Sequence, residues 1–246
     1  MDSSNLMQKK FDLIIFDLDG TLVDGREAIR ESFHLVLEKF NLPQLEDDKI
    51  DAMIGLPLVE MFENTLPPSN RHLAWKLTEV YAERYKQTGH IGTTILSNVI
   101  PTLEKLKKDG FKLAVATSKR NEAVGPLLVK IGLYKYFDLV TGLREGMRNK
   151  PYPDMIEYVM EQLNVGTQRT VMVGDTPLDI ITARNSGIHV IAVTSSIALG
   201  ITTMDKICNA NPDAIISSLV DLSNNLYSKH NQAKPNSTDH NKRIIV

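Results

Sequence analysis

The stretch FDLIIFDLDGT, residues 11–21, decides the fold. Its first half, Phe11 to Phe16, is a short apolar run that stops at two acidic residues and Gly20. A run of this length and composition is typical of a strand buried on both faces of a parallel sheet. Such a strand would not normally end in two carboxylates, Asp17 and Asp19, unless a cation neutralised them. The stretch therefore predicts a buried strand followed by a charged loop.

Strand-like and helix-like segments alternate after Gly92. Apolar residues at helical spacing and short β-branched runs distinguish the two. We expect helices at residues 99–108, 122–130, 154–163 and 178–185, and strands at residues 111–117, 139–141, 170–173, 189–193 and 214–216, with a short helix after the last strand. This alternation requires crossover connections, so the strands should be parallel with helices on both faces. The predicted fold class is α/β, a Rossmann-like doubly wound parallel sheet.

Residues 23–92 are expected to form an all-helical cap domain inserted after the first strand. One amphipathic helix is predicted at residues 26–40, with Asp24 as its cap, and another at about residues 70–87. The insertion should cover the carboxyl ends of the strands, where open α/β sheets bind ligands. The predicted division is a core domain of residues 1–22 and 93–227, a cap domain of residues 23–92 and a flexible polar tail of residues 228–246.

Polar side chains end three of the predicted strands, where packing alone would not place them. They are Asp17 with Asp19, Thr117 with Ser118, and Asp175 with Asp179. Because the carboxyl ends of parallel strands lie at one edge of the sheet, these groups should converge. Carboxylate oxygens suit Mg²⁺, and the two hydroxyls can donate to an oxyanion. Lys150, before the Pro-Tyr-Pro turn, could pair with both a carboxylate and a phosphate.

In this order, the motifs resemble those of haloacid dehalogenase superfamily hydrolases. They are DLDGT at residues 17–21, Thr117 with Ser118, Lys150, and Gly174 and Asp175 with Asp179. The resemblance extends from Phe11 to about Leu226. It is greatest to the phosphoglycolate phosphatase-like branch, because of the helical insert, the segment IGLPL at 54–58 and the segment GDTPLD at 174–179.

This resemblance implies a Mg²⁺-dependent phosphomonoester hydrolase that acts through an aspartyl-phosphate intermediate on a small phosphorylated metabolite. Asp17 would be the nucleophile, and Asp19 would protonate the leaving group and then activate water. Asp17, Asp175 and the backbone carbonyl of Asp19 would hold Mg²⁺. Phosphoglycolate is the first substrate to consider, followed by a nucleotide or pyrophosphate.

The resemblance also assigns the groups around the phosphate. Lys150, Thr117 and the backbone amides near Gly20 and Ser118 would bind the phosphoryl oxygens, which makes Thr117 and Lys150 catalytic. Asp179 would support the site, beside the metal or on Lys150, although an acid at a helix start can also be only a cap. Thr21 would brace the first loop.

Two further groups of residues lie near the expected entrance. Lys119 and Arg120 could face the substrate, but we expect them to be solvated at a helix start, and Trp75 to pack in the cap or core. Two segments depart from the branch pattern, VTSSIALG at 193–200 and the basic LREGMRN at 143–149. Because both segments lie near the expected entrance, these differences could change which substrate the site accepts.

Four alternatives to a phosphoglycolate phosphatase-like enzyme can be compared with the sequence. A nucleotide phosphatase or pyrophosphatase would have the same fold. A mutase of the β-phosphoglucomutase type is disfavoured, because Thr21 stands where mutases usually have a nonpolar residue and residues 55–58 contain no arginine. A non-catalytic binding protein is disfavoured by the intact carboxylates, and a dehalogenase by the presence of Asp19.

The composition restricts the partners. The 28 basic and 30 acidic residues give a net charge of −2, so no nucleic acid or membrane partner is expected. The apolar runs are too short for a signal peptide or a membrane span, and the single cysteine, Cys208, cannot close an internal disulfide. We therefore expect a cytoplasmic protein, either a monomer or a dimer.

Overall fold

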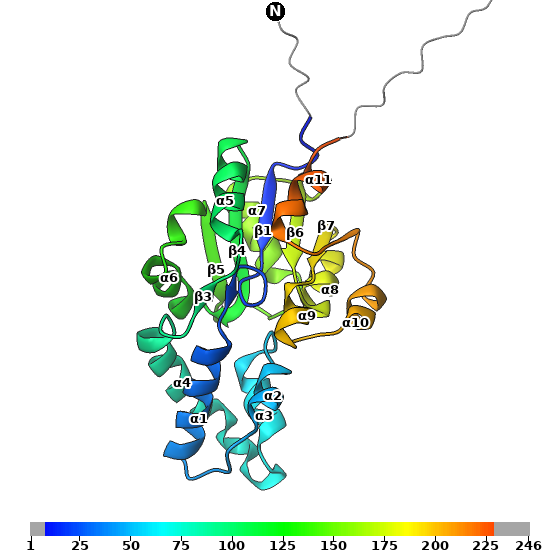
Figure 1. Cartoon of the computed structure of the whole chain (residues 1–246). Helices are drawn as coiled ribbons and strands as arrows, with labels where there is room; N and C mark the ends of the chain where they lie inside the picture. The colour runs from blue at the N-terminus through cyan, green and yellow to red at the C-terminus, as the bar shows by residue number, and fades with distance from the viewer. Residues whose placement is uncertain (1–7, 229–246) are drawn as a thin grey trace, which may run out of the picture.

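A computed structural model describes residues 8–228, and within them six parallel strands form the central sheet (Figure 1). Their order is β5-β4-β1-β6-β7-β8. The strands are β1 (Leu13–Phe16), β4 (Lys112–Arg120), β5 (Leu139–Leu143), β6 (Thr170–Gly174), β7 (His189–Val193) and β8 (Ala214–Ile216). The chain winds from β1 toward β5 and then returns to β6 on the other side of β1. The predicted doubly wound α/β class is confirmed.

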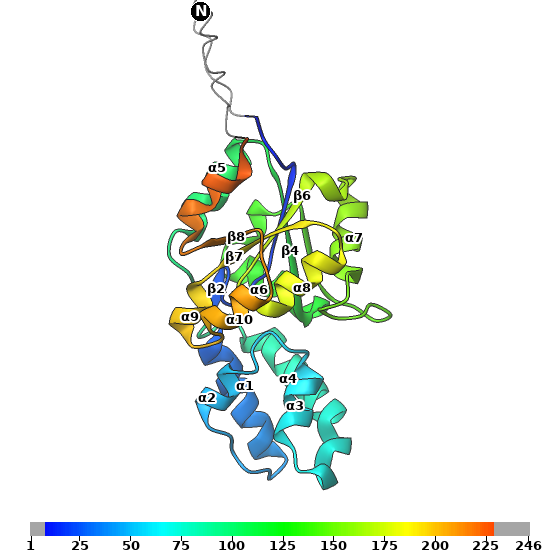
Figure 2. The same ribbon diagram turned by 90° about the vertical axis from the view of Figure 1, so that its right-hand side faces the viewer.

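Helices cover both faces of the sheet (Figure 2). The strand β1 is buried throughout, and alternate residues enter two different apolar clusters. Ile14 and Phe16 pack with helices α5 (Val99–Lys108) and α6 (Asn121–Lys130). Leu13 and Ile15 pack with helices α7 (Asp154–Leu163) and α8 (Pro177–Asn185). This two-sided burial explains why the strand is an unbroken apolar run rather than an alternating one.

A helical unit lies beyond the carboxyl ends of the strands, at the bottom of Figure 1. It contains α1 (Arg26–Lys39), α2 (Asp47–Asp51), α3 (Leu58–Thr65), a 3₁₀ helix (Pro68–Leu73) and α4 (Ala74–Thr88). We call this unit the cap. Phe33 of α1 stacks on Phe62 of α3 with ring centroids 4.4 Å apart, and Tyr81 of α4 meets Phe62 edge-on. The apolar cluster that contains these rings continues onto the α5 and α6 face of the sheet.

A two-stranded antiparallel ribbon marks both crossings between the core and the cap. It pairs β2 (Val23–Asp24) with β3 (Thr94–Ile95). The expectation that residues 23–92 are all-helical is therefore wrong at its first two residues. Gly25, and not Asp24, is the N-cap residue of α1. The Asp24 side chain nevertheless accepts a hydrogen bond from the amide of Arg26, the first residue of the helix, at 3.1 Å, and also forms an ion pair with the Arg26 guanidinium at 2.7 Å. The proposed domain boundaries remain predictions.

Several predicted elements have different bounds. The helix expected at about residues 70–87 begins as an α-helix only at Ala74. The strand expected to end at Thr117 continues to Arg120, because Arg120 pairs with Leu143 of β5 after an irregularity in the register. Short elements that were not predicted are the 3₁₀ helices Tyr134–Tyr136, Thr167–Arg169 and Leu219–Leu222, and the helices α9 (Ser195–Leu199) and α10 (Met204–Asn209). The helix expected after β8 is α11 (Ser223–Leu226).

Two predictions concern the ends of the chain and membranes. The proposed tail of residues 228–246 lies, after Ser228, outside the described residues. Within residues 8–228, no helix has the length and apolar character needed to cross a bilayer.

The Phe33–Phe62 stack predicts a large loss of stability when it is removed. Phe33→Ala should lower the free energy of unfolding by about 3–5 kcal/mol, because it leaves a cavity in a fully buried site. Urea denaturation followed by circular dichroism measures the change. Tyr134→Ala is the matched control: this side chain is 48% exposed, so the expected change is within about 0.5 kcal/mol. Equal effects of the two substitutions would contradict the proposed packing of the cap.

Candidate active site

The strand order brings the predicted motifs together at one edge of the sheet. The strand β1 lies between β4 and β6, so Asp17, Thr117 and Asp175 end up at neighbouring positions. The backbone amide of Asp17 donates to the carbonyl of Val173 at 2.9 Å, which fixes the start of the first loop against β6. The connections after β1 and β6 lead to opposite sides, and they leave between them the crevice in which doubly wound sheets bind ligands.

Three buried carboxylates gather at this edge. Asp17, Asp175 and Asp179 each offer an oxygen, and these oxygens all lie within 4.8 Å of one another. Asp175 Oδ1 accepts a hydrogen bond from the Thr21 hydroxyl at 2.5 Å, whereas Asp175 Oδ2 is buried and has no partner in the described part of the chain. A buried carboxylate oxygen without a partner is costly, and a hard divalent cation would satisfy it. The donor set therefore fits Mg²⁺.

Lys150 provides the positive charge of this cluster. Its buried Nζ donates to Asp17 Oδ1 and to Asp179 Oδ1, both at 2.6 Å. Burial lowers the pKa of the Lys150 ammonium, but the two carboxylates outweigh this effect and hold the pKa above its usual value. Lys150 therefore stays a cation at neutral pH.

Two carboxyl groups of the cluster, those of Asp17 and Asp175, have raised pKa values. Burial raises the pKa of Asp17 to about 7, although Lys150 opposes the rise, and Asp179 adds to it. Burial and the neighbouring charges of Asp179 and Asp17 raise the pKa of Asp175 well above its usual range. Both shifts arise because three buried carboxyl groups lie close together, and a bound cation would reverse them.

Asp179 has both of the roles that the sequence left as alternatives. Its Oδ2 accepts from the amide of Thr176 at 2.9 Å and from the Thr176 hydroxyl at 2.7 Å, and the pair forms a capping box at the start of α8. Its Oδ1 holds Lys150. The helix cap thereby orients the lysine that contacts Asp17.

Gly20 is required by the shape of the first loop. Its φ is +80°, and a Cβ at this position would overlap the carboxylate of Asp175. Sequence analysis missed two residues that fasten this loop. The hydroxyl of Ser195 donates to the carbonyl of Gly20, and that of Ser196 donates to the carbonyl of Asp175 at 2.8 Å. Both belong to the segment 193–200 that departs from the branch pattern, and their place after β7 was the available signal.

The hydroxyl motif lies inside β4 rather than after it. Thr117 is buried, and its Oγ1 accepts only a long hydrogen bond from the amide of Lys119 at 3.4 Å. The Ser118 hydroxyl is buried with no partner among residues 8–228. Both residues line the cavity above the carboxylates, so their polar atoms are available to a ligand there.

Comparison with known proteins agrees with this geometry. The family model described as haloacid dehalogenase-like hydrolase matches residues 14–193, which span all four motifs. The chain belongs to this family. A haloacid dehalogenase-like hydrolase from Streptococcus pneumoniae has the same fold, with a TM-score of 0.78 and 24% identity over 88% of this chain and 98% of that one. The superfamily assignment made from the motifs is confirmed.

Curated relatives of this hydrolase have phosphatase names. The chain is 35% identical to the probable phosphatase IndB of Dickeya dadantii, over 85% of this chain and 91% of the relative. It is 29% identical to a phosphoglycolate phosphatase of Vibrio parahaemolyticus, over 88% and 96%. It is also 29% identical to the pyrophosphatase PpaX of Halalkalibacterium halodurans, over 85% and 94%. The predicted likeness to the phosphoglycolate phosphatase branch is confirmed.

In this hydrolase, Asp19 is paired separately from the other carboxylates. Its Oδ2 lies 2.8 Å from Lys119 Nζ. The expectation that Lys119 is solvated is wrong: its side chain is only 13% exposed, and its Nζ lies 4.5 Å from the ring centroid of Tyr85 in the cap. The reason is that β4 continues through this position and α4 covers it. Arg120 is exposed, as expected.

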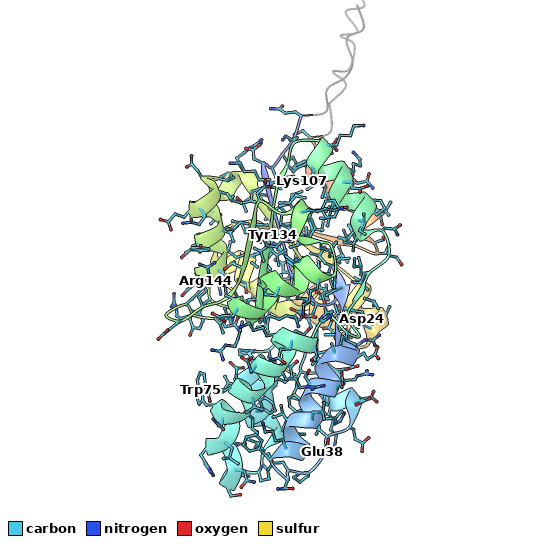
Figure 3. The ribbon with its side chains drawn as sticks, turned by 90° about the vertical axis from the view of Figure 1, so that its left-hand side faces the viewer. Asp24, Glu38, Trp75, Lys107, Tyr134 and Arg144 are labelled. Carbon is cyan, nitrogen blue, oxygen red and sulfur yellow. The ribbon has the colours of Figure 1, made fainter. Side chains whose placement is uncertain are left out.

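A cavity of about 510 Å³ lies between the core and the cap of the hydrolase. Asp17, Asp19, Thr117 and Lys150 line its core side, and the cap contributes mainly apolar side chains, among them Ile54, Leu56, Leu58, Met61, Trp75 and Tyr81. Trp75 is 68% exposed, so the expectation that it packs in the cap or core is wrong. Figure 3 shows Trp75 on the cap and Arg144 on the core, at the same side of the molecule.

The raised pKa of Asp17 predicts how stability depends on pH in the absence of metal. Because the native carboxyl binds its proton more tightly than the unfolded one, the native state loses stability as the pH rises from about 4 to about 7. Asp17→Asn removes this loss, so the variant should gain on the order of 3 kcal/mol over the wild type between pH 4 and pH 8. Urea denaturation in chelator at both pH values measures the gain. Asp205→Asn, at an exposed carboxylate, controls for the change of charge, and a gain of the same size there would contradict the prediction.

Proposed function

We propose that this hydrolase is a Mg²⁺-dependent phosphomonoesterase that forms an aspartyl phosphate on Asp17. One observation carries the proposal. The carboxylate of Asp17 lies in the cavity wall and is held by the buried Lys150. Two further carboxylates lie beside it, and one of them, Asp175, has an oxygen without a hydrogen-bond partner in the described part of the chain. This is what attack on a phosphate needs: a fixed nucleophile, a cation site and donors for the phosphoryl oxygens.

The residues would perform the reaction in two stages. Asp17 attacks phosphorus while the bond to the leaving oxygen breaks, and Asp19 gives that oxygen a proton. Asp19 then takes a proton from water, whose oxygen attacks the same phosphorus, releasing phosphate and restoring the Asp17 carboxylate. Lys150 and the hydroxyls of Thr117 and Ser118 lie along the cavity, where they can hold the phosphoryl oxygens.

Asp17, Asp175 and the backbone carbonyl of Asp19 are the proposed ligands of Mg²⁺. The ion would supply positive charge that screens the anionic nucleophile from the anionic phosphate. Lys150 alone contributes one positive charge to three carboxylates in the described cluster. The acidic donor set is thus better matched to a divalent cation than to the lysine by itself.

The leaving group is the least determined part of the substrate. The names of relatives make phosphoglycolate the first candidate and pyrophosphate the second. A cavity of 510 Å³ is nevertheless in the range that holds drug-sized ligands, and its cap side is mainly apolar. A carboxylate placed against this wall would lose hydration unless Arg120 or Arg144 reached it. We therefore propose that the panel of substrates includes phosphate esters with an apolar ring.

The first prediction from this proposal concerns catalysis. Phosphate release from a panel of phosphoglycolate, sugar phosphates, nucleotides, pyrophosphate and aryl phosphates should require Mg²⁺ and cease in EDTA. Asp17→Asn should lower kcat by at least about 10³-fold, because an amide cannot attack phosphorus. Asp205→Asn is the control for an acidic residue outside the site. If no compound on the panel is hydrolysed, the phosphatase proposal fails and a non-catalytic binding role gains support.

The second prediction concerns the apolar wall. Trp75→Ala should raise KM for aryl phosphates by about 3- to 10-fold and leave KM for phosphoglycolate nearly unchanged, because the indole offers contact only to a ring. Steady-state kinetics measure both. Trp75 is the single tryptophan of the chain, so quenching of its fluorescence by an aryl phosphate in Asp17→Asn gives a second readout. Equal changes in KM for both substrates would contradict a role in recognising the ring.

A further inference from the structure

Lys119 connects the core to the cap at the cavity. It lies near the end of β4, shortly before α6 begins, and its Nζ lies 2.8 Å from Asp19 Oδ2. The same Nζ lies 4.5 Å from the ring centroid of Tyr85, which belongs to α4. Lysine is among the residues that are least often buried, and a buried one is normally paired. Here the partners come from two parts of the fold that are far apart in sequence.

The other side of Asp19 is packed against backbone. Asp19 Oδ1 is buried and accepts no hydrogen bond within residues 8–228. A Cβ on Gly25 would lie 2.5 Å from this oxygen, so only glycine leaves room for the carboxylate there. Gly25 restricts the position of the Asp19 carboxylate by contact, but it has no side chain that could bind either oxygen. Lys119 is therefore the side chain that sets the direction of the Asp19 carboxylate.

Tyr85 in turn confines Lys119. Its ring is buried and stacks on Tyr81 with centroids 5.5 Å apart, so the aromatic face under the ammonium is fixed by the packing of α4. The attraction between a cation and an aromatic face is stronger when the cation is desolvated, and the Lys119 side chain is only 13% exposed. Movement of α4 away from β4 would leave Lys119 with Asp19 alone.

We infer that Lys119 is a positioning residue that aligns Asp19 for proton transfer to the leaving group, and that Tyr85 makes this alignment depend on the seating of α4. The inference depends on the proposed phosphatase function. The two lysines of the cavity then have different roles, because Lys150 contacts Asp17 whereas Lys119 acts only through Asp19.

Two aryl phosphates provide a readout that a purely structural role would not change. Phenyl phosphate and 4-nitrophenyl phosphate present similar rings, but the phenolate leaving group is the more basic and needs the proton more. Lys119→Met should lower kcat/KM for phenyl phosphate by about 10- to 100-fold and for 4-nitrophenyl phosphate by less than about 3-fold. Lys119→Arg, which keeps the charge, should recover part of the loss. Lys107→Met, at an exposed ion pair with Asp138, is the control lysine.

Variants of Asp19 and Tyr85 test whether Lys119 acts through these two residues. In an Asp19→Asn background, Lys119→Met should cause no further change in the ratio of kcat/KM for the two esters, because Lys119 acts through that carboxylate. Tyr85→Leu should reproduce part of the selective loss, whereas Tyr85→Phe, which keeps the ring face, should retain the wild-type ratio of the two esters. A loss that is equal for both esters in Lys119→Met would overturn the inference.

A stability measurement tests the contacts without turnover. The urea midpoints of Lys119→Met, Tyr85→Leu and the double variant should not be additive, and the same should hold for Lys119→Met with Asp19→Asn. Additive shifts in both cycles would overturn the inference even in an active enzyme. A wild-type chain that hydrolyses no ester refutes the phosphatase proposal and the inference together, whereas an active wild type with an unselective Lys119→Met refutes the inference alone.

Discussion

The ammonium of Lys150 lies 2.6 Å from both Asp17 and Asp179, and the arrangement of the sheet edge depends on this buried contact. Removing one lysine and several carboxylates from water is expensive, so the groups persist there only if many other contacts fix them. Asp17 is fixed by β1 and by the hydrogen bond that its amide donates to the carbonyl of Val173 in β6, and Asp179 is fixed by the capping box of α8. The doubly wound topology supplies these elements at one place from segments more than 100 residues apart. This cost in stability is the physical condition for the proposed nucleophile and cation site to lie together in the cavity wall.

Asp17 and Asp19 are neighbours in sequence but have different electrostatic environments. Asp17 shares Lys150 with Asp179, and Asp19 has Lys119. Two carboxylates can take different roles in one reaction only when their surroundings distinguish them. The loop after β1 provides part of this distinction, because it places the fully buried Leu18 between them. The two lysines, from the ends of β4 and of the loop after β5, provide the rest.

The sheet and the acidic cluster were predictable because their signals are local. An apolar run that ends in acid marks a strand end by itself, and the rule for parallel sheets then brings Asp17 and Asp175 together. The burial of Lys119 was not predictable, because it depends on α4 covering the end of β4, and a lysine after a hydroxyl motif looks like a solvated residue. Ser195 and Ser196 were missed for the same reason: their place after β7 puts them at the same edge of the sheet, but nothing near them in sequence shows that the carbonyls of Gly20 and Asp175 lie opposite. The exposure of Trp75 likewise follows from where the cap meets the core, and an apolar residue on a helix gives no sign of it.

The insertion point of the cap lies next to Asp19, the proposed acid–base residue. The ribbon of β2 and β3, through which the chain enters and leaves the cap, is continuous with the first loop: the amide of Gly20 donates to the carbonyl of Val23 at 2.8 Å, and Asp19 forms a bridge with Val23. Gly25, at the start of α1, lies against one oxygen of Asp19, and Tyr85 of α4 reaches the other through Lys119. Asp19 is thus linked to the cap in two ways, directly at Gly25 and through Lys119 at Tyr85. The ion pair and the backbone hydrogen bond of Asp17 involve only core elements. A change in the position of the cap therefore acts on Asp19, the proposed proton-transferring carboxylate, while Asp17, the proposed nucleophile, keeps its contacts.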